Sequence, residues 1–378
     1  GYRVFYVSTK FAPGHAPATA RIVRTGVYEL TLPGRPGVRI YRDAFTGPAL
    51  DRASAALQDF VRAHDIAEAV CLVQHPFWEP LATALRDVYG WKVVYDCMDR
   101  HDGFLDNSPA VLRCEAPLIR DSDLVIASSQ GLLDRARQSN RKCILVRNGA
   151  DYGHFSKLPQ REASPLARLP RPVVGYYGAI AEWFDTGAVR LAASRHPDWS
   201  FVLIGDTYGA DIHALEGLSN VYLLGEKRYE DLPAYLAGFD VCTIPFLRTP
   251  LTEATNPVKV YEYLAAGKPV VAVALPELVA LGEAVYCYHS NDEFVCLLEK
   301  ALTEDSPARR IQRQAIAREN TWERRYSELK SAIESLYPKA AIVIVTWNNL
   351  DLTRRCIASV LADRTWPNVE LIVVDNGS

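Results

Sequence analysis

The chain of 378 residues is 49% hydrophobic and 23% charged, an ordinary globular composition with enough length for two or three domains. A formal net charge of −3 provides no overall positive field, so nucleic-acid binding is disfavoured. The sequence shows no signal peptide and no apolar run long enough to span a bilayer, so we expect a soluble protein that is at most peripheral to a membrane.

The eight cysteines are scattered along the chain, and none forms a C-x-x-C pair. This spacing indicates neither a zinc site nor a disulfide framework. Several cysteines lie in apolar runs, where cysteine behaves as a small core residue. We therefore expect a protein of the reducing cytoplasm.

Short apolar runs alternate with helical patterns along most of the chain. They predict five strands in the first half and six in the second, at 3–8, 69–74, 92–98, 123–129, 142–149, 172–178, 200–206, 220–225, 240–246, 269–274 and 284–288. These runs are rich in Val, Ile and Tyr without strict alternation, which is typical of parallel strands buried on both faces. Amphipathic segments such as 49–65 and 109–122 predict helices between them. The alternation predicts an α/β fold with two doubly wound, Rossmann-like domains.

The domain boundaries are predicted from composition. A Pro-rich, charged segment at 156–171 separates a first domain, 1–160, from a second, 171–338, which one or two charged helices at 309–338 would close. A strand–helix–strand pattern then occupies 340–378. The only methionine is Met98 and both ends interrupt strand patterns, so we expect a fragment of a longer polypeptide.

The segment NPVKVYEYLAAGKPVVA (256–272) predicts a helix at a strand end. Asn256 is expected to cap a helix that begins at Pro257, and Gly267 to end it in the left-handed conformation. The helix N-terminus is a ready anion site, to which Lys259 adds a full charge. Glu262, on the same face, could accept both hydroxyls of a ribose. The alternative is a solvated Lys–Glu pair on a surface helix.

Three glycine-bearing loops follow predicted strands of the second half, at Gly178, Gly205 and Gly225. Ligands of open parallel sheets bind outside the carboxyl ends of the strands, and glycine lets the backbone approach them closely. The loop 225–228, which ends at Arg228, precedes another helix start. Together with Lys259, these loops predict a phosphate-binding cleft.

The densest ionisable cluster of the first half is VVYDCMDRHDGF (93–104), which places Asp96, Asp99 and His101 directly after a strand. Carboxylates there could act as a general base or orient a hydroxyl. The alternatives are a metal site, which lacks a second ligand cluster, and a capped, solvated turn. His75 and Trp78 also follow a strand. His75 is more commonly structural before proline, and Trp78 could stack on a sugar or fill a gap.

Together, RNGADYGHF (147–155), VVYDCMDRHDGF and NPVKVYEYLAAGKPVVA resemble motifs of GT-B glycosyltransferases of family four, or group one, of bacterial polysaccharide assembly. The resemblance spans about residues 1–338. It implies two Rossmann-like domains facing a cleft, with a nucleotide-sugar donor in the second and a glycan or lipid-linked glycan acceptor in the first. It implies neither a cofactor nor a metal in this part.

The resemblance also implies residue roles. Glu262 matches the glutamate that holds the donor ribose, Lys259 would contact the diphosphate, and Asp99 matches the position of an acceptor-side base. The remaining candidates for contact with the donor are Gly178, Gly205, Arg228, Thr255 and Asn256. The candidates for contact with the acceptor are His75, Trp78 and His101.

The sequence departs from the family pattern at several points. Many members carry a second glutamate eight residues before the first, where this chain has Ala254, with Glu253 one residue out of register. The usual Arg…Lys pair after strand 172–178 is absent, as is an opening strand–helix unit before the first predicted strand. Retaining and inverting chemistry therefore both stay open. The alternative functions are a GT-B epimerase and a non-catalytic module that supports another domain.

Residues 340–378 resemble the start of a GT-A glycosyltransferase of family two. The resemblance implies that Thr346, Asn348 and Asp375 border a nucleotide pocket. The metal-binding and catalytic residues of a complete family-two domain would come later in the chain, so a divalent metal is expected only there. We accordingly expect the remainder of its own longer chain to be a partner of the first two domains.

Overall fold

The computed structural model describes residues 2–14, 16–362 and 368–377. The first half contains nine strands and five α-helices within this range, which are β1 (Val4–Val7), β2 (Ala12–Pro13), β3 (Thr19–Arg24), β4 (Val27–Thr31), β5 (Pro33–Gly34), α1 (Pro48–Ala63), β6 (Val70–Val73), α2 (Glu79–Tyr89), β7 (Lys92–Cys97), α3 (Pro109–Asp121), β8 (Leu124–Ala127), α4 (Gln130–Arg137), β9 (Cys143–Leu145) and α5 (Tyr152–Phe155).

The second half and the C-terminal segment follow. Their elements are β10 (Val173–Tyr177), α6 (Thr186–Arg195), β11 (Ser200–Ile204), β12 (Val221–Leu223), α7 (Leu232–Gly238), β13 (Val241–Ile244), α8 (Pro250–Glu253), α9 (Val258–Ala265), β14 (Val270–Val273), α10 (Pro276–Val279), β15 (Tyr286–Tyr288), α11 (Asn291–Thr303), α12 (Pro307–Glu319), α13 (Trp322–Glu334), β16 (Ala340–Thr346), α14 (Leu350–Ala362) and β17 (Val369–Asp375). Every strand predicted from the sequence is present.

The second half is built on one six-stranded parallel sheet in the order β12-β11-β10-β13-β14-β15. Its strands β10, β11, β13 and β14 are buried along their whole length, as their continuous apolar runs predict. The strand order reverses between β10 and β13. That reversal is the topological switch point, outside which open α/β sheets bind their ligands.

The first half combines a four-stranded parallel sheet, β6-β7-β8-β9, with a separate three-stranded sheet, β1-β4-β3. The sequence did not predict β3 and β4, which pair antiparallel to each other. Every residue of β3 is exposed, so this edge strand has no apolar stripe for a sequence pattern to reveal. The predicted strand at 3–8 is β1, and it pairs with β4.

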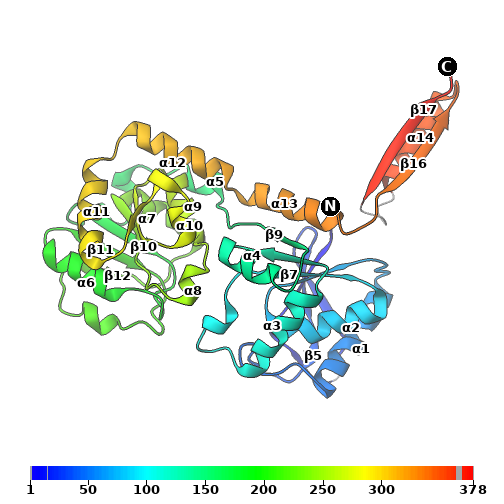
Figure 1. The fold of residues 1–378 in the computed structure, drawn as a ribbon, viewed down its shortest axis with the longest axis horizontal. Helices are drawn as coiled ribbons and strands as arrows, with labels where there is room; N and C mark the ends of the chain where they lie inside the picture. Colours follow the sequence, from blue (N-terminus) through cyan, green and yellow to red (C-terminus); the bar gives the residue numbers. More distant parts are fainter. Residues whose placement is uncertain (1, 15, 363–367, 378) are drawn as a thin grey trace.

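The charged segment expected to close the second half forms two helices that serve different halves. Helix α12 contacts α9 of the second half, whereas α13 extends back toward the first (Figure 1). The apolar face of α13 packs on β7 and β8, through Leu329, Ala332 and Ile333 against Val94 and Leu124. The chain therefore crosses between the halves twice, once near Phe155 and again between α12 and α13.

The C-terminal segment forms a parallel pair, β16 and β17, linked by α14, and Figure 1 shows it standing apart from both halves. Both strands expose apolar side chains, including Val345 at 66% and Val373 at 45%. In the part of the chain that the structure describes, no helix is long and apolar enough to cross a membrane.

Candidate functional site

The switch point of the second sheet holds a lysine. Lys259, on the first turn of α9, extends its ammonium over the rings of Tyr176 and Phe246, 5.5 and 5.1 Å from their centroids. Tyr176 lies on β10, and Phe246 follows β13, so Lys259 lies where the strand order reverses. No described residue forms a hydrogen bond or an ion pair with this ammonium. A partly desolvated cation without an ion-pair partner is costly, and an anionic ligand would offset that cost.

The environment of Lys259 shifts its protonation. Burial lowers the pKa of Lys259 to about 8, and the carboxylate of Glu262 opposes the shift. The solvated surface pair that the sequence left open is therefore wrong, because Glu262 is only 6% exposed and no ion pair joins the two residues within the described structure. The two side chains are instead available to different parts of a ligand.

Glu262 faces aromatic and imidazole groups from three segments. Burial raises the pKa of its carboxyl group, while Tyr177, Lys259 and His154 oppose the rise. The ring of His154 stacks on Tyr229 with centroids 4.9 Å apart, and His154 Nε2 lies 3.1 Å from the Tyr229 carbonyl oxygen. Sequence analysis missed Tyr177, Tyr229 and His154 as neighbours of Glu262, although each lies at or just after a predicted strand end.

Of the predicted glycines, Gly178 lies directly against Lys259, and Gly205 packs on the backbone of Gly178. Both have positive φ, 131° for Gly178 and 152° for Gly205, which favours glycine over other residues. A Cβ atom on Gly178 would lie 2.7 Å from Lys259 Cε, and one on Gly205 would lie 1.9 Å from the Gly178 carbonyl oxygen. The two loops and the lysine therefore form one closely packed corner.

We expect Gly205→Ala to lower the free energy of unfolding by about 2–4 kcal/mol, because the new methyl group collides with backbone and the φ angle is strained. Urea unfolding followed by circular dichroism measures the change. Gly131→Ala is the matched control, since a Cβ at this exposed helical glycine meets nothing within 4 Å. Equal stability of the Gly205→Ala variant and the wild type would contradict the packing described.

The predicted cap of α9 is wrong by one residue. Pro257 occupies the N-cap position and Val258 begins the helix, while Gly267 does end it with φ of 70°. Asn256 is 2% exposed, and α9 has no side-chain cap hydrogen bond. Its Oδ1 accepts a hydrogen bond from the Asn148 amide, and its Nδ2 donates to the Tyr261 hydroxyl and to Glu277.

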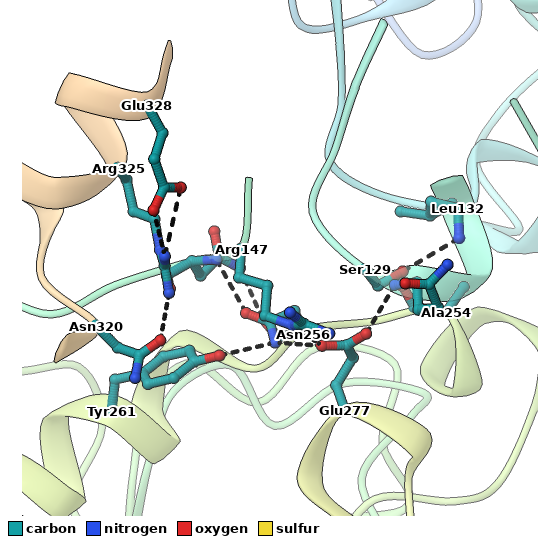
Figure 2. Close-up of polar contacts among 12 residues, drawn as sticks. Ser129, Leu132, Arg147, Ala254, Asn256, Tyr261, Glu277, Asn320, Arg325 and Glu328 are labelled. Atoms are coloured by element: carbon teal, nitrogen blue, oxygen red, sulfur yellow. Dashed lines mark hydrogen bonds and ion pairs between the residues drawn. The ribbon is translucent and has the colours of Figure 1, made fainter. Parts of the chain in front are cut away.

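Asn256 belongs to a polar network that joins the two halves, centred on Glu277 of α10 (Figure 2). Glu277 is 3% exposed and accepts hydrogen bonds from the Gln130 amide at 2.7 Å and from Arg147 Nε at 2.6 Å. Ser129 Oγ also donates to the Ala254 carbonyl oxygen at 2.6 Å. We call Gln130, Arg147, Asn148, Asn256 and Glu277 the Glu277 network. It was not predicted, because its hydrogen bonds between the halves join residues more than a hundred positions apart.

Two other predicted donor contacts have local partners. The Thr255 hydroxyl donates to the Leu251 carbonyl oxygen, and the exposed Arg228 pairs with Glu230. Glu253, one residue out of the family register, is exposed and pairs with Arg248 at 2.9 Å. Ala254 is buried and packs in a core cluster made mostly of residues from the first half.

The acceptor-side candidates gather at the carboxyl end of β7. Burial and the neighbouring carboxylate of Asp96 raise the pKa of Asp99. His75 and His101 are in ring contact, with centroids 5.1 Å apart, and burial lowers the pKa of His101 to about 4. Trp78 packs on Phe11, Phe45 and Phe77, so most of its ring fills the core. The predicted cluster is thus a half-buried acid pair beside two neutral imidazoles.

The three candidates of the C-terminal segment lie at the ends of its two strands. Thr346 and Asp375 are opposite each other in the parallel register of β16 and β17, and Asn348 has a positive φ of 50° in the turn that follows. Among the residues that the structure describes, no group of three or more His, Cys, Asp or Glu side chains is placed to hold a metal ion.

Two family models match the chain. Residues 171–304 match the glycosyl transferases of group 1, and residues 341–378 match glycosyl transferase family 2. The chain is 29% identical over 305 residues to TuaH of Bacillus subtilis strain 168, a glycosyltransferase named for teichuronic acid biosynthesis, and the alignment covers 75% of each chain.

Solved structures share the fold. HepE of Anabaena, in complex with UDP and glucose, matches with a TM-score of 0.61 at 19% identity, over 78% of this chain and 84% of HepE. Sucrose-phosphate synthase from Thermosynechococcus elongatus matches with a TM-score of 0.68 at 16% identity, over 89% of both chains. At these identities the likeness concerns the arrangement of the two halves and their sheets.

Proposed function

Because the chain is a glycosyltransferase of the GT-B fold, with group 1 sequence over residues 171–304, we propose that it transfers a hexosyl group from a nucleoside diphosphate sugar to a hydroxyl group of a growing glycan. The unpartnered ammonium of Lys259 at the switch point carries this proposal. The biosynthetic name of TuaH and the UDP and glucose bound to HepE support a UDP-sugar donor and a cell-surface polysaccharide product.

In this proposal the donor lies across the switch point. Lys259 and the N-terminus of α9 neutralise the diphosphate, and the absence of side chains at Gly178 and Gly205 lets their loops pack closely beside Lys259. Glu262 accepts hydrogen bonds from the ribose hydroxyls, which places the base toward Tyr229. Positive charge held in place before the reaction stabilises the leaving nucleoside diphosphate. We propose that this half needs no metal or other cofactor.

On the acceptor side, we propose Asp99 as the general base. Its raised pKa makes it a stronger base than an exposed aspartate. The acceptor oxygen forms a bond to the anomeric carbon, the bond from that carbon to the diphosphate oxygen breaks, and the acceptor proton passes to Asp99. A lipid-linked acceptor would bring the protein to a membrane surface at the cytoplasmic face. Co-sedimentation with vesicles that carry such an acceptor tests that part of the proposal.

Nucleotide binding tests the donor site. We expect UDP, measured against GDP and dTDP by isothermal titration calorimetry, to bind the full chain. Its Kd should weaken about tenfold between pH 7 and pH 9, because a lysine of pKa about 8 goes from about one-tenth to about nine-tenths deprotonated over that range. Lys259→Met should weaken binding about 30- to 150-fold at pH 7 and remove the pH dependence.

Two further variants sharpen this measurement. Glu262→Gln should weaken the binding of UDP while keeping the pH dependence that Lys259 causes. Lys300→Met, at an exposed lysine of α11, should bind UDP as the wild type does. The proposal is overturned if none of the three nucleotides binds, or if Lys259→Met binds them as tightly as the wild type.

A further inference from the structure

Six aromatic and imidazole rings form a continuous chain that crosses from the first half to the second. Neighbouring ring centroids lie between 4.9 and 6.5 Å apart. We call these residues the aromatic collar, and they are Tyr41, His75, His101, Phe104, Trp183 and Tyr208. The Phe104–Trp183 contact, with centroids 6.2 Å apart and an interplanar angle of 87°, joins the halves.

The collar lies between the proposed base and the proposed donor site. His101 and Phe104 are on the loop after β7 that carries Asp99. Trp183 is on the loop after β10 that begins with Gly178, and its carbonyl oxygen accepts a hydrogen bond from the Leu247 amide at 2.7 Å. The carboxyl ends of β7 and β10 therefore direct both loops to the same place.

The two ends of the collar also approach each other. The pKa of Tyr208 is raised first by burial, then by the charge of Glu182 and then by Tyr41 of the first half. Tyr41 and Tyr208 are therefore close enough to interact electrostatically. Tyr41 and Tyr208 are 52% and 53% exposed, so both rings present an open face to solvent. Exposed aromatic faces beside carboxylates are suited to sugars, because the rings cover the C–H face while the carboxylates accept hydroxyl hydrogens.

The charges around the collar disfavour an anionic ligand. Glu182, Asp206 and Asp106 all lie near Tyr208, and the nearby cation Arg42 is already paired with Asp106. The low pKa of His101 keeps its imidazole neutral near pH 7. Arg135, the cation that acts on His101, is paired with Glu115 at 3.0 Å and Asp102 at 3.8 Å, so an acceptor that carries a carboxylate or phosphate beside Tyr208 would meet mainly repulsion.

The imidazoles add an unused hydrogen-bonding capacity. Nε2 of His101 and Nε2 of His75 are buried and have no hydrogen-bond partner in the described structure. The His75 Nδ1 accepts from the Phe77 amide, which leaves the proton on Nε2. The amide of Asn107 lies close to His75, yet its Oδ1 also lacks a hydrogen bond.

We propose that the aromatic collar is the acceptor subsite and that it binds an uncharged sugar unit of the glycan by stacking, with residues of both halves contributing. This inference rests on the proposed transfer reaction and names the class of acceptor. It adds Tyr41, Phe104, Trp183 and Tyr208 to the residues that determine specificity. Because Trp183 and Tyr208 come from the donor-binding half, the subsite is complete only when the halves are in contact.

Saturation-transfer NMR on the full chain with UDP bound tests the subsite. The probes are the methyl glycosides of glucose, galactose and N-acetylglucosamine, together with methyl glucuronide and glucose 1-phosphate. We expect at least one neutral glycoside to receive saturation and the two anions to receive none. Tyr208→Ala and Trp183→Ala should each raise the Kd for the neutral glycoside about tenfold and leave the Kd for UDP unchanged.

The control is Trp322→Ala, at an exposed tryptophan of α13 outside the collar, which should bind like the wild type. Tyr208 is exposed, so its variant reports on binding even if Trp183→Ala unfolds. The collar proposal is overturned if UDP binds while no neutral glycoside is saturated, if Tyr208→Ala binds the glycoside as the wild type does, or if the anions bind more tightly. Failure of UDP itself to bind would instead overturn the donor site.

Discussion

We expect Asp99→Asn to lower the rate of sugar transfer by about 100- to 10,000-fold, because the amide cannot take the proton from the acceptor hydroxyl. The affinity for UDP should stay unchanged, since the proposed nucleotide contacts are those of Lys259 and Glu262 and Asp99 takes part only in the proton transfer from the acceptor. Steady-state kinetics with a UDP-sugar and the glycan acceptor, alongside calorimetry with UDP, measures both quantities.

The raised pKa of Asp99 also predicts how the rate of transfer changes with pH. Asp99 must be ionised to act as a base, and burial together with Asp96 raises its pKa above the ordinary value of 3.8. The rate of transfer should therefore fall as the pH is lowered, and the fall should begin at a higher pH than an exposed aspartate would give. Asp87→Asn, at an exposed aspartate of α2, is the matched control. Undiminished transfer by Asp99→Asn would remove Asp99 from its proposed role.

Glu277→Ala is expected to lower the free energy of unfolding by about 3 kcal/mol, because it leaves Arg147 and two buried donors without their acceptor. Glu277 accepts from Gln130 and Arg147 of the first half and from Asn256 of the second, so its loss weakens the contact between the halves (Figure 2). Urea unfolding gives the stability, and small-angle scattering shows whether the halves separate.

The control is Glu283→Ala, which removes an exposed glutamate six residues further along. This variant should unfold at the same urea concentration as the wild type. Asn256→Ala should reproduce part of the Glu277→Ala effect, since it removes the hydrogen bonds to Asn148 and Tyr261 as well. Wild-type stability of Glu277→Ala would mean that the network contributes little to the interface.

Ala254 stands where many glycosyltransferases of the resembled family carry a second glutamate, and the structure shows the surroundings of this position. Its side chain packs with Cys97 and Leu132 of the first half, and its carbonyl oxygen accepts from Ser129. A glutamate at this position would be buried against an apolar cluster without a partner, which is unfavourable. The polar groups that hold the donor sugar must therefore come from elsewhere, and Glu253 is exposed and already paired with Arg248.

Local patterns in the sequence determined much of this protein. Buried strands such as β10 and β13 follow from continuous apolar runs, and the end of α9 follows from Gly267. The same-face spacing of Lys259 and Glu262 is a property of helix geometry, because residues three apart lie on one side of any α-helix. These features depend on neighbours within a few residues, so the sequence alone was sufficient.

The tertiary structure decided what depends on distant contacts. Asn256, predicted to cap α9, is instead buried and accepts a hydrogen bond from the Asn148 amide. Helix α13, predicted to close the second half, packs on the first half. The tertiary structure also left Lys259 without an ion pair or hydrogen bond to any described residue and joined Phe104 to Trp183 across the two halves. Each outcome depends on side chains that lie tens to hundreds of residues apart in sequence. No local pattern encodes such pairs, because burial and charge compensation are set only when the sheets and loops meet.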